Sequence, residues 1–416
     1  MTSTTIFIII IAILIFDYLL ERLLDYLNST RWTDVLPKEL QGIYDAEKYK
    51  KQQNYTKTKH RFSLLVSSLS FVLMLIILFL GGFGWLDGFV RQYTVNPIFM
   101  ALLYFGILGI AADIFSTPFS VYSTFVIEEK FGFNKTTPKT FIFDKIKGWL
   151  LSAIIGGGLF SLIIWIYEST GIYFWLYAWF VVSVFSIFMA MFYSNLIVPL
   201  FNKQTPLEDG ELRKAIQTFS EKVGFKLKNI YVIDGSKRSN KANAYFTGLG
   251  MKKRIVLYDT LIKNHSIDEL VAVLVHEIGH YKKRHTLLGV FLSIFQTGLM
   301  LFILSLFIAK GSELSEILSG ALQAEASFHI GILVFGLLYS PLSLILGLIM
   351  NIISRKNEYA ADYFAGKNFN AKALIEALKK LSVNNLSNLT PHPVYVFFHY
   401  SHPPLLERLN ALGRIK

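Results

Sequence analysis

The segment His-Glu-Ile-Gly-His at residues 276–280 is the part of this chain best suited to metal chemistry. In a helix, positions i and i+4 lie one turn apart on the same face, so His276 and His280 can bind one zinc ion. Glu277 can take a proton from a water molecule that the metal polarises. An apolar run directly before the motif favours the required helix. The pattern therefore predicts a hydrolytic zinc site.

The third metal ligand must come from elsewhere in the chain. A catalytic zinc usually has three protein ligands and one open position. Because the chain has no cysteine, the ligand must be His, Asp or Glu. We favour Glu358, since His280 lies just before one predicted membrane span and Glu358 just after the next, and such a hairpin returns to the same side. The alternative is that Glu358 is an ordinary surface charge.

Asp362 follows Glu358 by four residues and therefore lies on the same helix face. Metal-bound imidazoles commonly donate their second N–H to a carboxylate, which fixes the orientation of the ring. We expect Asp362 to accept such a bond from His276 or His280. The competing interpretation is an aspartate on the helix surface.

Two further segments hold candidate residues for substrate binding and catalysis. His402 lies in the sequence Ser-His-Pro-Pro, where a rigid loop could hold its imidazole over the metal to stabilise an oxyanion. A plain turn explains the same residues equally well. Asn243 and Ala244 begin a predicted strand, which would bind a peptide if it lies at the edge of a sheet. The Asn243 side chain could also form hydrogen bonds with the substrate backbone. A core strand is the alternative.

The composition is typical of a membrane protein. Of the 416 residues, 53% are hydrophobic and 17% are charged, whereas soluble domains carry about 25% charged residues. Seven apolar segments have the length needed to span a bilayer as helices. They lie at 4–20, 62–82, 98–117, 148–167, 173–197, 287–308 and 329–352.

The positive charges predict the orientation of these spans. Of the 41 Lys and Arg residues, 39 fall in the segments 21–61, 118–147, 198–286 and 353–416, and only Arg91 and Lys310 fall on the other side. The positive-inside rule then places the N-terminus outside, and the C-terminus and metal site in the cytoplasm. Because topology accounts for the net charge of +12, we expect no nucleic-acid partner.

The polar segments divide the chain into four parts. We predict a five-span membrane region at 1–197, a first catalytic part at 198–286, a two-span hairpin at 287–352 and a second catalytic part at 353–416. The first catalytic part should contain a helix at 209–223, strands at 229–234, 243–249 and 254–258, and a motif helix with a capping box at Ser266 and Glu269. The second should contain a helix that stops at Gly366, helices at 371–382 and 404–412, and a loop at 384–404.

Taken together, these features resemble the type I CaaX prenyl endopeptidases, which are seven-span zinc proteases of the gluzincin class. The resemblance covers nearly the whole chain and rests on the order of the spans and six motifs. These are IEEKFGFNKTT (127–137), PLFNKQTPLEDGEL (199–212), NAYFTG (243–248), HEIGH (276–280), NEYAAD (357–362) and SHPPLLERL (401–409). It implies a mainly α fold, in which the spans form a barrel around a water-filled chamber and a cytoplasmic gluzincin-type domain contains a small β-sheet.

The resemblance also implies roles for the candidate residues. His276, His280 and Glu358 would bind one zinc ion, Glu277 would be the general base, Asp362 would support the ligands, and Asn243 and His402 would lie in the cleft. The substrates would be peptides or proteins with a C-terminal CaaX sequence, including lipidated ones. The membrane would be the endoplasmic reticulum in a eukaryote or the inner membrane in a bacterium, with membrane lipid as the other partner.

Two other functions remain open from the residues alone. A quality-control metalloprotease that degrades damaged membrane proteins would use the same chemistry without CaaX specificity. A transporter or channel with a structural zinc is the second alternative. Transporters usually show repeated halves and charges within their spans, whereas this chain shows no internal repeat and no Lys or Arg within the predicted spans.

Overall fold

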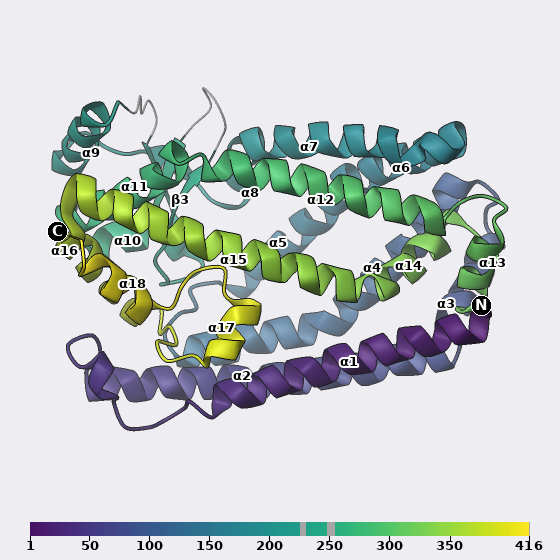
Figure 1. Ribbon diagram of the computed structural model, residues 1–416, viewed down its shortest axis with the longest axis horizontal. Coiled ribbons are helices and arrows are strands. Elements are labelled where there is room, and N and C mark those ends of the chain that lie inside the picture. Colours follow the sequence, from purple (N-terminus) through teal and green to yellow (C-terminus); the bar gives the residue numbers. More distant parts are fainter. Residues whose placement is uncertain (225–229, 248–253, 416) are drawn as a thin grey trace.

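The computed structural model describes residues 1–224, 230–247 and 254–415. Long helices run along the longest axis of the molecule (Figure 1). Short helices and a small sheet gather at the end that holds the C-terminus, and the N-terminus lies at the opposite end (Figure 1). The architecture is a long helical region with a compact mixed region at one end.

The long apolar helices form the membrane region. They are α1 Ser3–Ser29, α2 Ala46–Phe79, α4 Pro97–Tyr122, α5 Pro138–Leu151, α6 Gly157–Thr170, α7 Phe174–Leu196, α12 His285–Phe307, α14 Phe328–Leu338 and α15 Ser340–Ala365. Within the described residues, five helices are long and apolar enough to cross a membrane, or six if the bent pair α14 and α15 is one span. The predicted count of seven is therefore not confirmed.

The difference between these counts lies in one helical run, Pro138–Phe201, which is 64 residues long. A straight helix of that length would extend about 96 Å, about three times the hydrocarbon thickness of a bilayer. The run contains the predicted spans 148–167 and 173–197. Gly171, with a φ of 54°, opens a short 3-10 turn between α6 and α7, and these two helices contact each other. The break explains how one run can contain two predicted spans, and the count of seven stays a prediction.

The spans are packed loosely against one another. Only 6% to 17% of the residues in their apolar windows are buried. The chain exposes 21994 Å² of surface, whereas a compact monomer of this size would expose about 16,000 Å². Many side chains of the spans are therefore accessible on more than one face of the helix.

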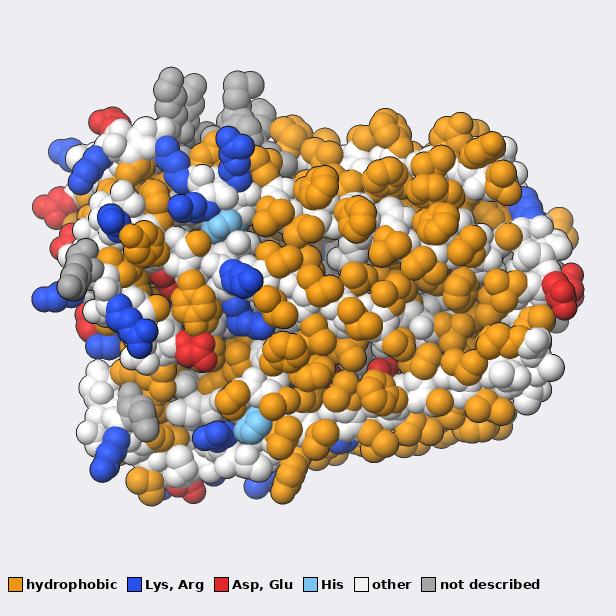
Figure 2. All heavy atoms as spheres, viewed as in Figure 1, with side chains coloured by type: hydrophobic (Ala, Val, Ile, Leu, Met, Phe, Trp, Pro, Cys, Tyr) orange, Lys and Arg blue, Asp and Glu red, His pale blue; other side chains and the backbone are white. Residues whose placement is uncertain are grey.

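Charged side chains are unevenly distributed over the surface. On the face shown in Figure 2, hydrophobic side chains cover the long helices, and Lys and Arg gather over the end that holds the small sheet and the C-terminus. The opposite end of this face has few cations. This pattern agrees with the charge asymmetry of the sequence, and the direction in which the chain crosses the membrane stays a prediction.

The small sheet has four strands in the order β1-β2-β4-β3. The strands are β1 Gln204–Pro206, β2 Ile230–Ile233, β3 Ala244–Thr247 and β4 Arg254–Tyr258. β2 and β4 run parallel, and β1 and β3 pair antiparallel to them on the outside. The three predicted strands are confirmed over the described residues, while residues 229, 248 and 249 of the predicted ranges lie outside them. Strand β1 is an addition, and β3 lies at an edge of the sheet.

The motif helix α11, Ile267–Lys282, begins at the predicted capping box. The Ser266 side chain accepts a hydrogen bond from the Glu269 amide, and the Glu269 carboxylate accepts one from the Ser266 amide. The helix packs against the sheet and the surrounding helices through its own buried side chains, which include Leu270, Leu274 and Ile278. The capping box thus fixes where the helix begins, and the packing fixes which face carries the metal-binding motif.

The short helices complete the chain. They are α3 Gly82–Arg91, α8 Val198–Phe201, α9 Glu211–Lys222, α10 Asp259–Asn264, α13 Glu313–Gly320, α16 Ala371–Asn384, α17 Pro393–His399 and α18 Leu405–Leu412. The helices predicted at 209–223, 371–382 and 404–412 are therefore confirmed as α9, α16 and α18.

Two predictions for the C-terminal part are wrong. The segment 384–404 is not all loop, because Pro393 at the first turn and the His392 side chain start the short helix α17. Gly366 does not stop α15, because its backbone is helical and a π turn, Gly366–Asn370, continues the chain into α16. A left-handed backbone is what would have made this glycine a stop.

Helices α11 and α15 approach each other closely where Gly279 faces Ala361. A Cβ atom on Gly279 would lie 3.2 Å from the Cα of Ala361 and 3.2 Å from the ring of Phe364. Both contacts are tighter than ordinary packing allows. The absence of a side chain at Gly279 therefore sets the distance between the helix of the HEIGH motif and the helix of Glu358.

We expect the substitution Gly279→Ala to push these two helices apart. Overpacking of this kind costs about 1–3 kcal/mol, so the purified protein should unfold at a lower temperature and retain less metal. Gly347→Ala is the matched control, because Gly347 lies on the partner helix α15 and its added methyl group would meet no atom within 4 Å. If Gly279→Ala has the same melting temperature and metal content as Gly347→Ala and the wild type, the close approach is not required.

Candidate metal centre and active site

Three side chains from two helices converge on one point. Nε2 of His276 and Nε2 of His280, both on α11, lie 3.2 Å apart. The Glu358 carboxylate on α15 reaches them with Oε2 3.5 Å from the first and Oε1 3.2 Å from the second. One ligand atom of each residue lies within 4.8 Å of the others. The structure thus brings together the three residues predicted as metal ligands.

The spacing of these atoms fits a tetrahedral metal ion. Bonds of about 2.05 Å at tetrahedral angles place neighbouring ligand atoms about 3.3 Å apart. The two imidazole nitrogens lie 3.2 Å apart, and each lies 3.2 to 3.5 Å from a Glu358 oxygen, which is Oε2 for His276 and Oε1 for His280. Oε2 of Glu358 is buried and has no hydrogen-bond partner among the described residues. A buried carboxylate oxygen needs a positive partner, and the Arg408 guanidinium lies 3.4 Å away without forming a hydrogen bond, so this oxygen can still bind a metal ion. The donor set therefore fits a divalent metal ion.

A buried ion pair between Asp362 and Arg408 contacts the metal ligands. Nδ1 of His276 lies 2.9 Å from Oδ1 of Asp362. The Arg408 guanidinium on α18 donates two hydrogen bonds to the same carboxylate, with distances of 2.8 and 2.6 Å. Arg408 also lies 3.4 Å from Oε2 of Glu358. The structure thus places Asp362 beside His276, one of the two histidines considered for it, and adds an arginine that balances the acidic charge.

The surroundings of His276 favour a positive charge at this position. Burial disfavours the charged imidazole, but the contacts with Asp362 and Glu358 outweigh it and raise the pKa of His276 to about 9. Metal binding requires the neutral imidazole, so a metal ion must displace a proton from His276. The same carboxylates then stabilise the metal charge in place of the proton.

His285 lies beside the second histidine ligand. Arg284 has a left-handed backbone with a φ of 60°, and this sharp turn starts α12 immediately after α11. The turn places Nδ1 of His285 3.0 Å from Nδ1 of His280. Sequence analysis does not assign His285 to the site. The signal available in the sequence is its separation from His280 by five residues across a helix end.

An open cavity of about 400 Å³ is lined by two of the three ligands, His280 and Glu358. Glu277 and His402 also line it. Nε2 of His402 lies 3.4 Å from Oε1 of Glu358, and its Nδ1 lies 3.0 Å from the Ser401 hydroxyl. The His402 side chain is 65% exposed, so it is free to contact a molecule in the cavity. The predicted base and the predicted oxyanion donor therefore border the same space.

The edge strand β3 forms another side of this cavity. Ala244 and Tyr245 line it. Asn243 precedes the strand, is exposed, and accepts a hydrogen bond from the Ala244 amide through its own side chain. Asn243 is not among the described residues that line the cavity. The structure thus brings Ala244 to the site and leaves the Asn243 side chain outside it.

One wall of the cavity is apolar. It is formed by residues of α12 and α15, which are Leu288, Leu292, Met350 and Ile353. The metal ligands and the catalytic candidates lie at one part of the cavity, and these aliphatic side chains extend from it along two predicted spans. The arrangement can accommodate a ligand with a polar and an apolar part.

Some residues of the site lie outside the sequence-based prediction. Arg408 is in the segment SHPPLLERL and Asn357 in the segment NEYAAD, so the motifs contain them without indicating their contacts. Arg355 donates hydrogen bonds to the carbonyls of Val396 and Tyr400, which ties the segment before His402 to α15. A single arginine gives no sequence signal for such backbone contacts.

Comparison with known proteins agrees with this geometry. Residues 25–203 match the family model described as CAAX prenyl protease N-terminal, five membrane helices, and residues 206–416 match that of peptidase family M48. The chain belongs to peptidase family M48. It is a membrane metalloprotease of the CAAX prenyl protease type, its cofactor is a metal ion, and its substrates are peptides or proteins. The two models meet near the predicted boundary after residue 197, and the division into four parts stays a prediction.

Relatives of this metalloprotease match over almost their full length. The chain is 37% identical to CAAX prenyl protease 1 of Saccharomyces cerevisiae, with 96% of this chain and 92% of the relative covered. It is 38% identical to the homolog of Arabidopsis thaliana, with 97% and 96% covered. The crystal structure of Ste24p from S. mikatae matches with a TM-score of 0.92 and 37% identity, covering 99% of this chain and 100% of that chain.

We expect Asp362→Asn to weaken metal binding about 10- to 100-fold, the usual effect of losing a supporting carboxylate. The amide has the same shape but no charge to balance Arg408 or orient His276. The measurement is metal affinity by chelator competition, with circular dichroism to confirm the helical content. Glu376→Gln is the matched control, because this exposed carboxylate on α16 pairs only with Lys379. Affinities equal to that of the wild type in both variants would contradict the role of Asp362.

Proposed function

We propose that this metalloprotease uses one zinc ion to hydrolyse peptide bonds near the C-terminus of prenylated CAAX-type proteins. The observation that carries the proposal is the convergence of His276, His280 and Glu358 beside a cavity lined by Glu277 and an apolar wall. Relatives named CAAX prenyl protease 1 support the substrate class. On the predicted topology, the reaction takes place at the cytoplasmic face of the membrane.

The chemistry is a direct attack of water on the scissile carbonyl. His276, His280 and Glu358 would hold the zinc, which supplies a Lewis acid that polarises the carbonyl and lowers the pKa of water. The Glu277 carboxylate accepts the proton of the attacking water and later donates it to the leaving amine. No covalent acyl-enzyme is needed, because no serine, cysteine or threonine nucleophile takes part.

His402 is proposed to stabilise the negative charge that develops on the carbonyl oxygen. Its imidazole is exposed at the cavity and close to Glu358, and donors directed at such an oxygen are worth several kcal/mol in other enzymes. Asn243 is proposed to bind the peptide backbone. That role needs its side chain to leave the Ala244 amide when substrate is present.

The peptide is proposed to bind along β3. This strand lies at the edge of the sheet and borders the cavity through Ala244 and Tyr245. A substrate in extended conformation would add a strand to this edge and gain main-chain hydrogen bonds without a sequence requirement. Such binding places a peptide bond beside the metal ligands while specificity is left to other contacts.

The lipid is proposed to lie against the aliphatic residues of α12 and α15. Burial of a prenyl chain is favourable by about 25 cal/mol per Å² of apolar surface removed from water. The loosely packed spans are consistent with a hollow interior, in which a long hydrophobic group would be accommodated. A quality-control protease without CAAX specificity is the alternative that the experiments below distinguish.

We expect Glu277→Gln to keep its metal and to lose at least about 100-fold in kcat, because the amide cannot accept the proton. The measurements are zinc content by elemental analysis and cleavage of a farnesylated CAAX peptide by mass spectrometry. Glu211→Gln, an exposed carboxylate in the first turn of α9, is the control. Activity of Glu277→Gln within twofold of the wild type would exclude the proposed base.

We expect a chelator to abolish cleavage and stoichiometric zinc to restore it. The purified protein should contain one zinc per chain, and His280→Ala should contain none, because two ligands do not complete the site. Elemental analysis tests the metal separately from the activity. Full activity in the metal-free protein would reject the hydrolytic role of zinc.

We expect a farnesylated peptide to be cleaved with at least tenfold higher kcat/KM than the same peptide without its lipid. Leu292→Asn on the apolar wall should reduce this preference and leave cleavage of the unlipidated peptide unchanged. Equal rates for both peptides in the wild type, together with capture of mixed unfolded membrane proteins by Glu277→Gln, would instead favour the quality-control function.

A further inference from the structure

A second open cavity lies where α5, α8 and the sheet meet, and it shares no lining residue with the metal site. Its volume is about 490 Å³, within the range of small-molecule sites. Four cations line it, which are Lys147, Lys203, Lys237 and Arg254, and Asp234 is the one carboxylate among its described lining residues. The excess of positive charge calls for a negatively charged ligand.

The charges of these cations are not balanced within the protein. None of the four forms an ion pair with a carboxylate in the part of the chain that the structure describes. The segments 225–229 and 248–253 contain no Asp or Glu in the sequence. Oδ1 of Asp234 accepts hydrogen bonds from the Asn202 side chain and the Lys203 amide instead. The cavity therefore keeps a net positive charge.

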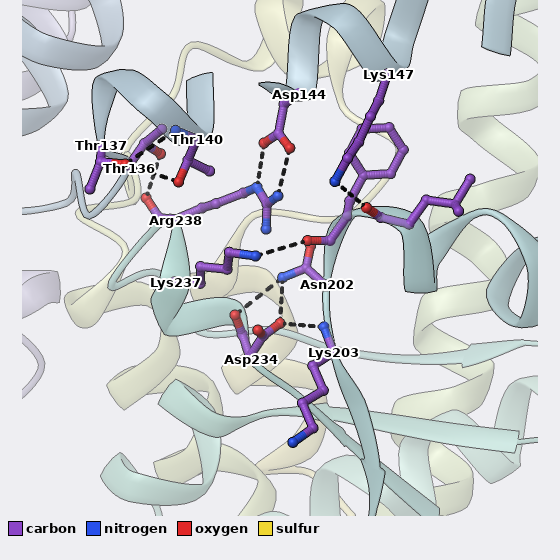
Figure 3. A network of polar contacts seen from close by, with 12 residues as sticks. Thr136, Thr137, Thr140, Asp144, Lys147, Asn202, Lys203, Asp234, Lys237 and Arg238 are labelled. Carbon is purple, nitrogen blue, oxygen red and sulfur yellow. Dashed lines mark hydrogen bonds and ion pairs between the residues drawn. The ribbon is translucent and has the colours of Figure 1, made fainter. Parts of the chain in front are cut away.

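Two of the lysines are held in place by backbone carbonyls. Nζ of Lys147 donates to the Leu200 carbonyl at 2.6 Å, and Nζ of Lys237 contacts the Phe201 carbonyl at 3.5 Å (Figure 3). These carbonyls belong to consecutive residues at the end of α8. An ammonium group has three donors, so each lysine retains donors for a ligand after making this contact.

Other contacts hold the residues around the cavity in place. The Arg254 guanidinium lies 4.4 Å from the ring centre of Tyr231 and donates to Gln204. Arg238 beside the cavity forms a two-bond ion pair with Asp144 of α5 (Figure 3). The cavity is thus assembled from a predicted membrane region and from the sheet, and Lys147, Lys237 and Arg254 are oriented before any ligand arrives.

The cavity lies at the level where the chain leaves the membrane. The span α7 ends at Leu196, and α8 with its two carbonyls follows immediately. Leu200 of its lining exposes a large apolar side chain, and so do Leu196, Trp149 and Leu150, which lie within four residues of lining residues in the sequence. Cations at the end of a predicted span, close in sequence to such residues, are expected at the depth of lipid headgroups.

We propose that this cavity binds the phosphate-bearing headgroup of an anionic phospholipid, whose acyl chains lie along the exposed apolar residues of α5 and α7. The predicted orientation places the site in the cytoplasmic leaflet, which carries the anionic lipids. The phosphate oxygens accept from the lysines and from Arg254, and the lipid links α5 to the sheet. A soluble phosphate anion has the same charge chemistry as this headgroup, but it would make no contact with the apolar surface.

The test uses the full-length protein in detergent and measures binding of short-chain phosphatidylinositol 4-phosphate by native mass spectrometry. The triple variant Lys147→Gln, Lys203→Gln, Lys237→Gln should bind this lipid about 100-fold more weakly, because each lysine is expected to contribute about fivefold. The matched control replaces Lys214, Lys263 and Lys372 by Gln, since these exposed lysines on α9, α10 and α16 lie away from the cavity. It should bind like the wild type.

Short-chain phosphatidylcholine and inorganic phosphate are the other two probes. Phosphatidylcholine should bind wild type and triple variant equally, and inorganic phosphate should not displace the anionic lipid at equal concentration. If the triple variant does not fold, Lys203→Gln alone should give a fivefold loss, because this exposed side chain makes no contact that folding requires.

Three results would overturn the proposal. Unchanged lipid binding by the triple or single variant would remove the cavity as the site. An equal loss in the control variant would indicate a general effect of net charge. Displacement of the lipid by an equal concentration of inorganic phosphate would make this a site for free anions.

Discussion

The close contact between α11 and α15 is the constraint on which the metal site depends. Three ligands come from two helices that are far apart in the sequence, and their atoms must come within about 3.3 Å of one another to bind one metal ion. Gly279 allows this approach, because any side chain there would meet the backbone of Ala361. The second variable position of the HExxH motif therefore has a packing function in this chain, beside the metal-binding function of its neighbours.

The second requirement is to balance charge in a buried place. His276, Glu358 and Asp362 are all nearly inaccessible to water, and unpaired charges in such a place are costly. Arg408 contacts both carboxylates and comes from α18. The C-terminal helix is thus held against the site by the same ion pair that orients the first histidine ligand, which couples the position of His402 to the metal site.

Much of this site could be predicted from the sequence because its main features are local. The i, i+4 spacing of the histidines, the capping box at Ser266 and the return of a two-span hairpin each follow from short-range rules. Glu358 was placed by topology, without any knowledge of distances. Arg408 and His285 could not be found in this way, since their contacts depend on how a C-terminal helix packs and how sharply α11 turns into α12.

The wrong prediction at Gly366 and the unconfirmed span count both turn on the backbone of a glycine. Gly366 was expected to end a helix because glycine tolerates a left-handed backbone, but its neighbours keep it helical and it lies close to Ile415 and Leu412. The span count depends on whether a break at Gly171 divides a helical run, which hydropathy alone does not decide. At Gly366 tertiary packing outweighs the local preference of a glycine, whereas Gly171 adopts the positive φ that glycine allows.

The metal site and the apolar wall share the helices α12 and α15. A protease for lipid-anchored peptides must bring a polar backbone and a hydrophobic chain to one cavity, and a site buried in a soluble domain would expose the lipid to water. Here α12 and α15 each carry site residues at one end and aliphatic side chains further along. The same two helices therefore position the catalytic chemistry and provide an apolar surface, so that a membrane-spanning hairpin serves both needs of the proposed substrate.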